Sequence, residues 1–249
     1  MLVLALDTST PACSVGLVEL SPLGPRVAPA PPGEPAWDQV VSAAGTFAVD
    51  ARRHGELLAP LIQQVLDARG AAPGDLGGVV VGLGPGPFTS LRVGIVTGAT
   101  FAAALGVPCH GVCSLDGLGA VTAGSAAVVT DARRREVFWA AYRDGRRIAG
   151  PAVDYPVKAA DLLLSQGVGS VTGPGVALYP DAFAAFNPAE TEERHASRAP
   201  LPPGYPSPFV LAALAASDLL AGRPPAPLTP IYLRRPDVAE PHPPKEVGG

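Results

Sequence analysis

The sequence predicts an α/β protein built from two lobes, each with a mixed β-sheet flanked by helices. Short apolar runs rich in β-branched residues alternate with longer segments of helical periodicity. Residues 79–105 are typical of a strand, a glycine-rich loop and a helix, and the element order of the first half returns in weaker form in the second. With 249 residues, 47% of them hydrophobic, the chain can bury a core in each lobe.

The first half predicts five strands and two helices. The expected strands cover Leu2–Asp7 and residues 13–20, 46–50, 79–82 and 108–112, with a Pro-rich connection at 21–35. The helix predicted over His54–Arg69 carries an apolar stripe and ends before Gly70, while Pro60 loosens its first half. A second helix is predicted over residues 89–105. This order along the chain indicates a mixed sheet covered by helices: three strands, then a helix, a strand, a second helix and a last strand.

The second half predicts a similar but weaker order. The expected strands cover residues 126–130, 136–142, 147–153 and 170–172, with a helix at 157–166 and a glycine turn at 173–175. Asp144-Gly145 predicts a hairpin between the second and third of these strands. We therefore expect one lobe at residues 1–113 and another at 114–208. A helix at 209–221 should pack back on the first lobe, and residues 222–249 form a Pro-rich tail.

Charge and cysteine content exclude several classes of protein. The formal net charge of −4 gives no overall field that attracts nucleic acid or an anionic membrane. Three cysteines are an odd number, and no signal sequence precedes the first strand, so we expect a soluble cytoplasmic protein. Cys109 and Cys113 lack the spacing of common zinc sites and belong to a strand-like run, which favours a place in the core. The apolar segment 91–105 is too short to span a membrane.

Two strand ends carry residues that can hold a phosphate. Asp7, Thr8 and Ser9 follow the first strand, and Gly84, Gly86 and Thr89 lie between the fourth strand and its helix. Free N–H groups at such a helix start suit an anion, and Asp7 suits Mg²⁺. The alternative is that an Asx-type turn simply holds the strand corner together, and we favour this interpretation.

The helix over residues 89–105 has one almost bare face. Gly94, Gly98 and Ala102 recur every four residues, so another backbone can approach closely on this side. The spacing does not decide whether that neighbour is the protein's own sheet or the helix of a partner. His54, Glu56, Leu57 and Leu61 of the preceding helix belong to the same face or its rim.

The chain resembles known families at two levels. Tandem units of this order with an Asp-Thr-Ser turn resemble the actin, sugar kinase and chaperone ATPase (ASKHA) superfamily, which implies two actin-like lobes, the second degenerate. Closer resemblance to the TsaB (YeaZ) family comes from five motifs, at residues 4–10, 54–60, 84–94, 131–137 and 230–234. The chain departs from that family's pattern at Gly55, Ala59 and Ser90, and none of these changes removes a charge or a ligand.

The resemblance implies a non-catalytic subunit of the bacterial machinery for threonylcarbamoyl-adenosine in tRNA. It implies a scaffold that binds the catalytic subunit TsaD, with the TsaE ATPase as a further partner and a homodimer through the same helical face. No residue is then catalytic, and ATP and metal are expected on the partner, while tRNA is bound only through the complex. The implied partner interface comprises His54, Glu56, Leu57, Leu61, Gly94, Gly98 and Ala102, and the vestigial phosphate site comprises Asp7, Thr8, Ser9, Gly84, Gly86 and Thr89.

Two other functions compete with this interpretation. One is an ATP-dependent phosphotransferase or a metallopeptidase-like enzyme of the same superfamily, and the other is a stand-alone homodimeric module. Against the peptidase, His54, His110, His195 and His242 are far apart, and no two lie one helical turn from each other. The arginines between residues 133 and 147 form a basic hairpin, which we interpret as a solvated charge run, with contact to tRNA phosphate as the alternative.

Overall fold

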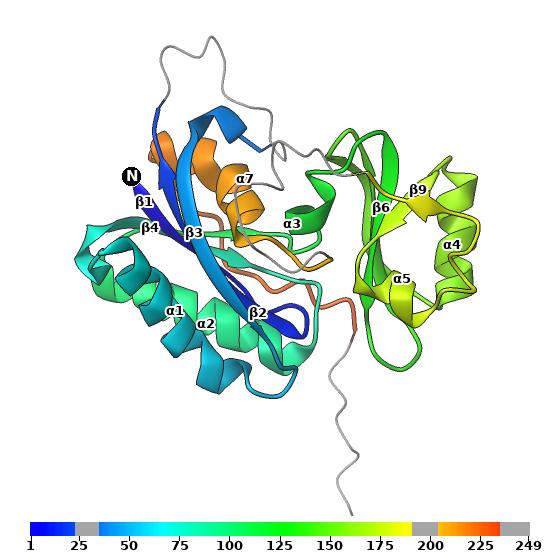
Figure 1. The fold of residues 1–249 in the computed structure, drawn as a ribbon, viewed down its shortest axis with the longest axis horizontal. Coiled ribbons are helices and arrows are strands. Elements are labelled where there is room, and N and C mark those ends of the chain that lie inside the picture. The colour runs from blue at the N-terminus through cyan, green and yellow to red at the C-terminus, as the bar shows by residue number, and fades with distance from the viewer. Residues whose placement is uncertain (23–34, 191–203, 235–249) are drawn as a thin grey trace, which may run out of the picture.

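The first lobe is a five-stranded mixed sheet with helices on both faces (Figure 1). The computed structural model describes residues 1–22, 35–190 and 204–234. The strands are β1 (Leu2–Asp7), β2 (Ala12–Leu20), β3 (Val40–Val49), β4 (Leu76–Gly82) and β5 (Cys109–Val112), in the order β3-β2-β1-β4-β5. β2 pairs antiparallel with β1 and β3, whereas β4 pairs parallel with β1 and β5. Two 3₁₀ turns, Trp37–Gln39 and Pro73–Asp75, precede β3 and β4.

Strand β1 shows why both faces of this sheet are covered. Leu4 and Leu6 point to the face that α1 (His54–Arg69) and α2 (Phe88–Leu105) cover. Val3 and Ala5 point to the opposite face, which is covered by α7 (Pro208–Leu220) (Figure 1). A strand buried on both sides has to be apolar at successive positions, as the run LVLAL is.

The second lobe has its own five-stranded sheet. Its strands are β6 (Ser125–Asp131), β7 (Val137–Arg143), β8 (Arg146–Asp154), β9 (Ser170–Thr172) and β10 (Asn187–Pro188), in the order β10-β9-β6-β7-β8. β6, β7 and β8 pair antiparallel, and β9 pairs parallel with β6 and β10. Helices α4 (Pro156–Ser165) and α5 (Pro174–Leu178) cover one face, and α3 (Asp116–Gly119) lies against the other. Read from β8, the pairing directions repeat those of the first sheet read from β3.

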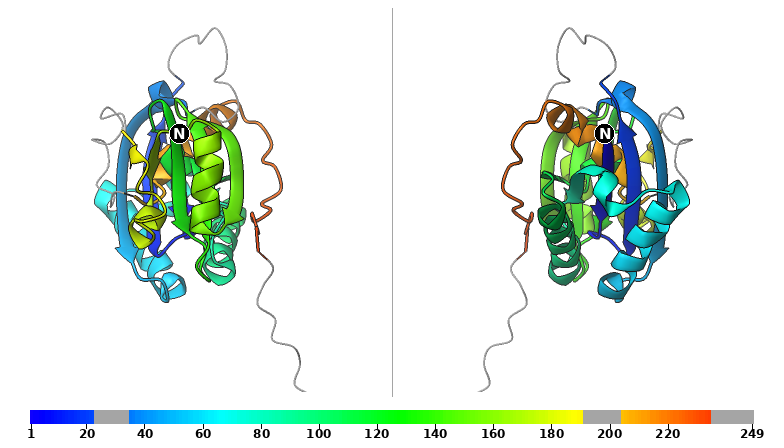
Figure 2. Two further views of the ribbon diagram at one scale, coloured as in Figure 1. Left: turned by 90° about the vertical axis from the view of Figure 1, so that its right-hand side faces the viewer. Right: turned by 90° about the vertical axis from the view of Figure 1, so that its left-hand side faces the viewer.

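The segment Pro230 to Arg234 joins the two lobes. The Ile231 N–H donates to the Leu83 carbonyl of the first lobe at 2.8 Å. The side chains of Ile231 and Leu233 pack on the core of the second lobe. Figure 2 shows this orange-red segment running along one side of the molecule.

Several elements differ from the sequence-based expectation. β3 begins at Val40 and not at residue 46, because pairing with β2 extends it through Ser42, Ala43 and Ala44, which have low intrinsic strand propensity. The short elements α3 and β10 were not predicted. His195 and His242, most of the Pro-rich connection 21–35 and the end of the tail lie outside the described residues.

Helix α2 is longer than predicted and has 18 residues. Among the described residues it is the one helix long and apolar enough, by length and composition, to cross a membrane, with a mean hydropathy of 1.4. One third of it is buried inside the protein (33%). One face of α2 therefore belongs to the core of the first lobe, Val93, Phe101 and Leu105 are partly buried against that core, and Val96 is exposed.

The bare face of α2 packs on the protein's own sheet. A methyl group added at Gly94 would overlap Thr8 Oγ1, and one at Gly98 would overlap Val81 Cγ1 and lie 3.2 Å from Leu6 Cδ1. Ala102 is buried in the same core. This position corrects the prediction that Gly94, Gly98 and Ala102 belong to a partner interface, because these residues have no surface left for a partner.

We expect Gly98→Ala to destabilise the protein. In an unconstrained helix this change stabilises by about 1 kcal/mol, but here the methyl group has no space and overpacking costs about 1–3 kcal/mol. In a protein of this size the melting temperature should fall by about 2–4 °C for each kcal/mol. Gly55→Ala is the matched control, because nothing lies within 4 Å of a methyl group at Gly55. A melting temperature of Gly98→Ala equal to or above the parent's would contradict this packing.

Candidate functional site

The turn after β1 is a buried hydrogen-bonded corner. Asp7 Oδ1 accepts from the Ser9 backbone N–H at 2.9 Å and from the Ser9 hydroxyl at 2.7 Å. The Thr8 hydroxyl donates to the Ser90 carbonyl at 2.7 Å, which ties the corner to the first turn of α2. Asp7, Thr8 and Ser9 are all buried. These contacts are those of an Asx turn that fixes one end of the sheet to a helix.

The glycine loop packs directly on this corner. A methyl group at Gly86 would overlap the Ser9 carbonyl oxygen, so the two backbones touch. The Gly84 N–H donates to the Ser114 hydroxyl at 3.0 Å. The structure thus brings Asp7, Thr8 and Ser9 together with the glycine loop, while Thr89 lies exposed in the first turn of α2.

Asp7 is a buried carboxylate with an incomplete set of partners. Burial raises the pKa of Asp7, although hydrogen bonds from Ser114 and Ser9 and the charge of His54 act in the opposite direction. Oδ2 nevertheless has no hydrogen bond of good geometry within the described residues. A methyl group at Gly82 would overlap this oxygen, so no room is left beside it on that side. An ionised Asp7 therefore costs folding free energy.

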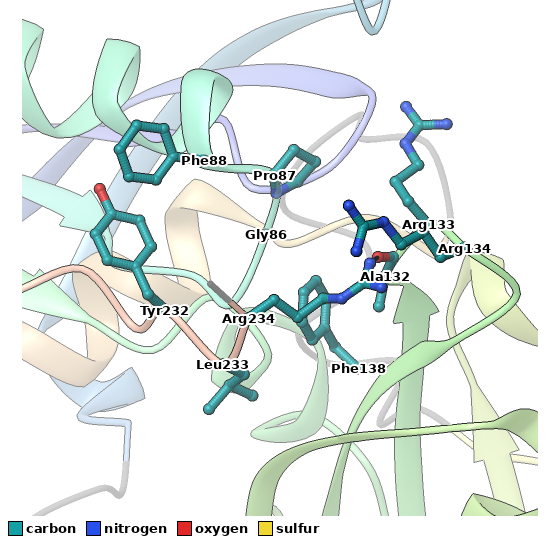
Figure 3. A pocket seen from close by; sticks show the side chains of 10 residues that line it. All are labelled: Gly86, Pro87, Phe88, Ala132, Arg133, Arg134, Phe138, Tyr232, Leu233 and Arg234. Atoms are coloured by element: carbon teal, nitrogen blue, oxygen red, sulfur yellow. Dashed lines mark hydrogen bonds between the residues drawn. The ribbon is translucent and has the colours of Figure 1, made fainter. Parts of the chain in front are cut away.

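A groove between the lobes lies beside this corner. A hollow of about 220 Å³ is lined by the start of α2, the β6–β7 loop and the C-terminal segment (Figure 3). A second hollow of about 130 Å³ shares Pro87 and Arg133 with the first and extends to Thr10, Arg52 and Thr89. We call the two hollows together the interlobe groove.

The β6–β7 loop carries an unusual backbone. Arg133, Arg134 and Arg135 have φ angles of 62°, 51° and 60°, so the backbone of three successive residues lies in the left-handed region that favours glycine. Asp131 Oδ1 accepts from the Arg133 N–H at 2.8 Å, and the Glu136 N–H donates to the Arg133 carbonyl at 2.9 Å. The loop is thus held in one conformation that places Arg133 and Arg134 on the groove.

The arginines predicted as one basic hairpin lie at opposite ends of the second sheet. Arg133 and Arg134 are in the β6–β7 loop, while Arg143 and Arg146 flank the β7–β8 turn at the far end of β7. Arg147 pairs with Asp116 at 3.2 Å. A different arginine, Arg234, reaches the groove from the C-terminal segment and is held by Glu136 at 2.7 Å. The sequence-based interpretation grouped these arginines because they are close in the sequence, whereas the fold places them at two ends of the sheet.

The donor groups do not fit a metal site. No group of three or more His, Cys, Asp or Glu side chains gathers within the ranges that the structure describes. His54 is buried in α1 with Nε2 2.8 Å from the Thr10 carbonyl oxygen, and His110 lies in β5. Burial raises the pKa of Cys13 and of Cys113 to about 12, so both remain thiols at neutral pH.

The exposed side of α2 is nearly uncharged, whereas α1 exposes the charged residues Glu56, Asp67 and Arg69 beside uncharged ones. We define the outer helix face as the exposed residues Ala59, Pro60, Val96, Thr100 and Ala103. Val96 is 58% exposed, and Arg92 is the one charged residue of α2. Of the predicted interface residues, His54 and Leu61 are buried, Leu57 is half-buried and Glu56 is exposed in an ion pair with Arg53. Exposed apolar surface of this kind is typical of an interaction site.

We expect Asp7→Asn to stabilise the protein at neutral pH. Because the pKa of Asp7 is raised by folding, its contribution to stability is fully present below pH 3.8 and is lost as the pH rises through the folded-state pKa. Asparagine keeps the shape without the charge, so thermal melts of variant and parent should coincide near pH 3 and diverge toward pH 7, by about 1–3 kcal/mol. Ser9→Ala, which removes a hydrogen bond to Oδ1, should be destabilising. An Asp7→Asn variant less stable than the parent at pH 7 would show that the charge is needed.

The chain is similar to known proteins over most of its length. Residues 48–183 match the family model described as TsaD: tRNA N6-adenosine threonylcarbamoyltransferase. An uncharacterized protein of Mycobacterium tuberculosis is 44% identical over 241 residues, which cover 94% of this chain and 92% of that protein. The tRNA threonylcarbamoyladenosine biosynthesis protein TsaB of Escherichia coli is 33% identical over 149 residues, 57% of this chain and 55% of that protein.

A solved structure supports the same relationship. YeaZ from Pseudomonas aeruginosa is 25% identical and superposes with a TM-score of 0.63 over 93% of this chain and all of that chain (100%). The match to the family model covers more than half of the present chain. The chain therefore belongs to the family described as TsaD, tRNA N6-adenosine threonylcarbamoyltransferase, and is a TsaB (YeaZ)-type member of it.

Proposed function

We propose that this protein is the non-catalytic scaffold subunit of a complex that makes threonylcarbamoyl-adenosine in tRNA. The pathway is supported by relatives in Escherichia coli and Bacillus subtilis that are named tRNA threonylcarbamoyladenosine biosynthesis protein TsaB. The partner we propose is a TsaD-type catalytic subunit in the cytoplasm, with ATP and metal bound there. A TsaE-type ATPase and a second copy of this chain are further proposed partners.

The observation that carries the scaffold role is the outer helix face. A helix that only covered a sheet would present charged side chains to solvent, whereas α2 exposes Val96, Thr100 and Ala103 on that side. On α1, Ala59 and Pro60 are exposed as well. Small and apolar side chains allow the helices of a partner to approach closely and to bury area without desolvating charge.

This proposal moves the partner interface by about half a turn around α2. The inward face holds Gly94, Gly98 and Ala102, so the partner contacts fall on the opposite side of the helix. Glu56 and Leu57 stay at the rim of the proposed interface.

We also propose that the two lobes are actin-like and that the second is degenerate. The matching pairing directions of the two sheets support a common plan. β10 has only two residues where β5 has four, and α5 has five where α2 has 18. A phosphotransferase or peptidase finds less support, because the Asp7 corner packs on the glycine loop and the described donor groups do not gather.

We expect Val96→Arg to abolish most of the partner binding. An arginine in the centre of an apolar helix interface leaves a buried unpaired charge, so affinity for the TsaD-type subunit should fall at least about tenfold. The fold should be unaffected, because the site is open to solvent. Val157→Arg is the matched control, since Val157 is 64% exposed on α4 of the second lobe.

Calorimetric titration and co-elution of the two subunits give the measurement. Both variants are first compared with the parent in thermal melts. A Val96→Arg variant that melts normally and still binds the partner with parental affinity would place the interface elsewhere.

A further inference from the structure

We propose that the interlobe groove binds an unpaired segment of RNA, with its phosphates on Arg52 and Arg133 and a base on Tyr232. The inference rests on the proposed function, because that function makes tRNA the substrate of the complex. It goes beyond that function in giving this subunit a direct contact with the RNA.

Two cations of the groove, Arg52 and Arg133, come from separate parts of the fold and can contact a ligand. Arg52 follows β3, and no carboxylate of residues 1–22, 35–190 or 204–234 forms an ion pair with it at 4 Å or less. Arg133 pairs with Asp131 at 3.4 Å, with a side chain that is 58% exposed. Exposed ion pairs of this kind contribute little, so a phosphate can replace the carboxylate at small cost.

An aromatic platform stands at the other end of the groove. Tyr232 stacks on Phe88 with ring centroids 4.9 Å apart and an interplanar angle of 30°. The Arg92 guanidinium lies 5.0 Å from the centroid of the Phe88 ring. Tyr232 is 40% exposed and lines the groove, so its position is fixed while part of its surface remains open. Arginines beside a held aromatic ring are the usual means of binding single-stranded nucleic acid.

The backbone of the β6–β7 loop supports a functional role for Arg133. Three successive left-handed residues other than glycine are costly, and such strain concentrates at binding and active sites. Asp131 and Glu136 hold the loop in this conformation. The loop places Arg133 where the two hollows meet, next to Pro87.

The dimensions of the groove favour a strand over an enclosed small ligand. Sites that enclose a small molecule usually have volumes of about 300–1,000 Å³. Each of the two hollows, at about 220 and 130 Å³, is smaller than this, and they meet at Pro87 and Arg133. Such a shape fits a backbone laid along it better than a free nucleotide. An acidic peptide would satisfy the arginines but would make no use of the aromatic platform.

The test compares RNA affinity in the complex of the full chain with its TsaD-type partner. The probe is an unmodified tRNA transcript that carries the substrate adenosine beside its anticodon, and binding is measured by fluorescence anisotropy at several salt concentrations. Arg52→Ala with Arg133→Ala should weaken binding about tenfold and lower the salt slope by about one for each lost phosphate contact. Tyr232→Leu should weaken binding by roughly tenfold with an unchanged salt slope.

Arg146→Ala is the matched control. It removes the same charge from an exposed position at the far end of the second sheet, and its RNA affinity should equal the parent's. Arg52→Ala alone covers the case in which Arg133→Ala disturbs the strained loop, because Arg52 lies on an exposed turn. Thermal melts and partner affinity are measured for every variant and should match those of the parent.

The outcomes separate this inference from the proposed function. Variants that form the complex but keep parental tRNA affinity would overturn the groove proposal and leave the scaffold role intact. A parent chain that fails to bind the partner would count against the scaffold role instead. The groove proposal would also be overturned if ADP or a polyglutamate peptide displaced the labelled tRNA as strongly as an unlabelled RNA oligonucleotide does. The ligand of the groove would then be a nucleotide or an acidic protein segment.

Discussion

The close approach of α2 to the first sheet is the contact on which the rest of the structure depends. Without side chains at Gly94 and Gly98, the helix lies against Thr8 and Val81 at a distance that a single methyl group would prevent. This approach positions the first turn of α2, where Ser90 accepts the hydrogen bond of Thr8. It also turns the opposite side of the helix, with Val96, toward solvent. One packing requirement therefore sets both the corner at Asp7 and the orientation of the outer helix face.

The corner after β1 shows how the fold keeps a buried carboxylate whose ionised form costs folding free energy. Asp7 is fully buried, and burial raises its pKa, yet its oxygen Oδ1 organises the turn through Ser9. Gly82 and Gly86 are required because any side chain would collide with Asp7 or with the backbone of Ser9. These glycines thus allow close packing of the backbone. The other common role of a glycine-rich loop between a strand and a helix is to bind a phosphate.

The groove between the lobes is created by the meeting of three segments distant in the sequence. The turn after β3 provides Arg52, the β6–β7 loop provides Arg133, and the C-terminal segment provides Tyr232. The C-terminal segment is held there by a hydrogen bond to the first lobe and by apolar packing on the second. The same contacts that join the lobes therefore build the groove, so its shape depends on how the lobes are arranged.

The sequence alone determined the strands and helices whose pattern is strong, because periodicity follows directly from burial of one or both faces. It predicted α1 at its observed bounds and the first strand, and it brought out the motifs of the TsaB family. It left undecided what covers the bare face of α2, since spacing describes a surface and not its neighbour. Tertiary structure decided that the sheet covers it. Tertiary structure also separated Arg133 from Arg146, because an antiparallel strand carries residues close in sequence to opposite ends of a sheet.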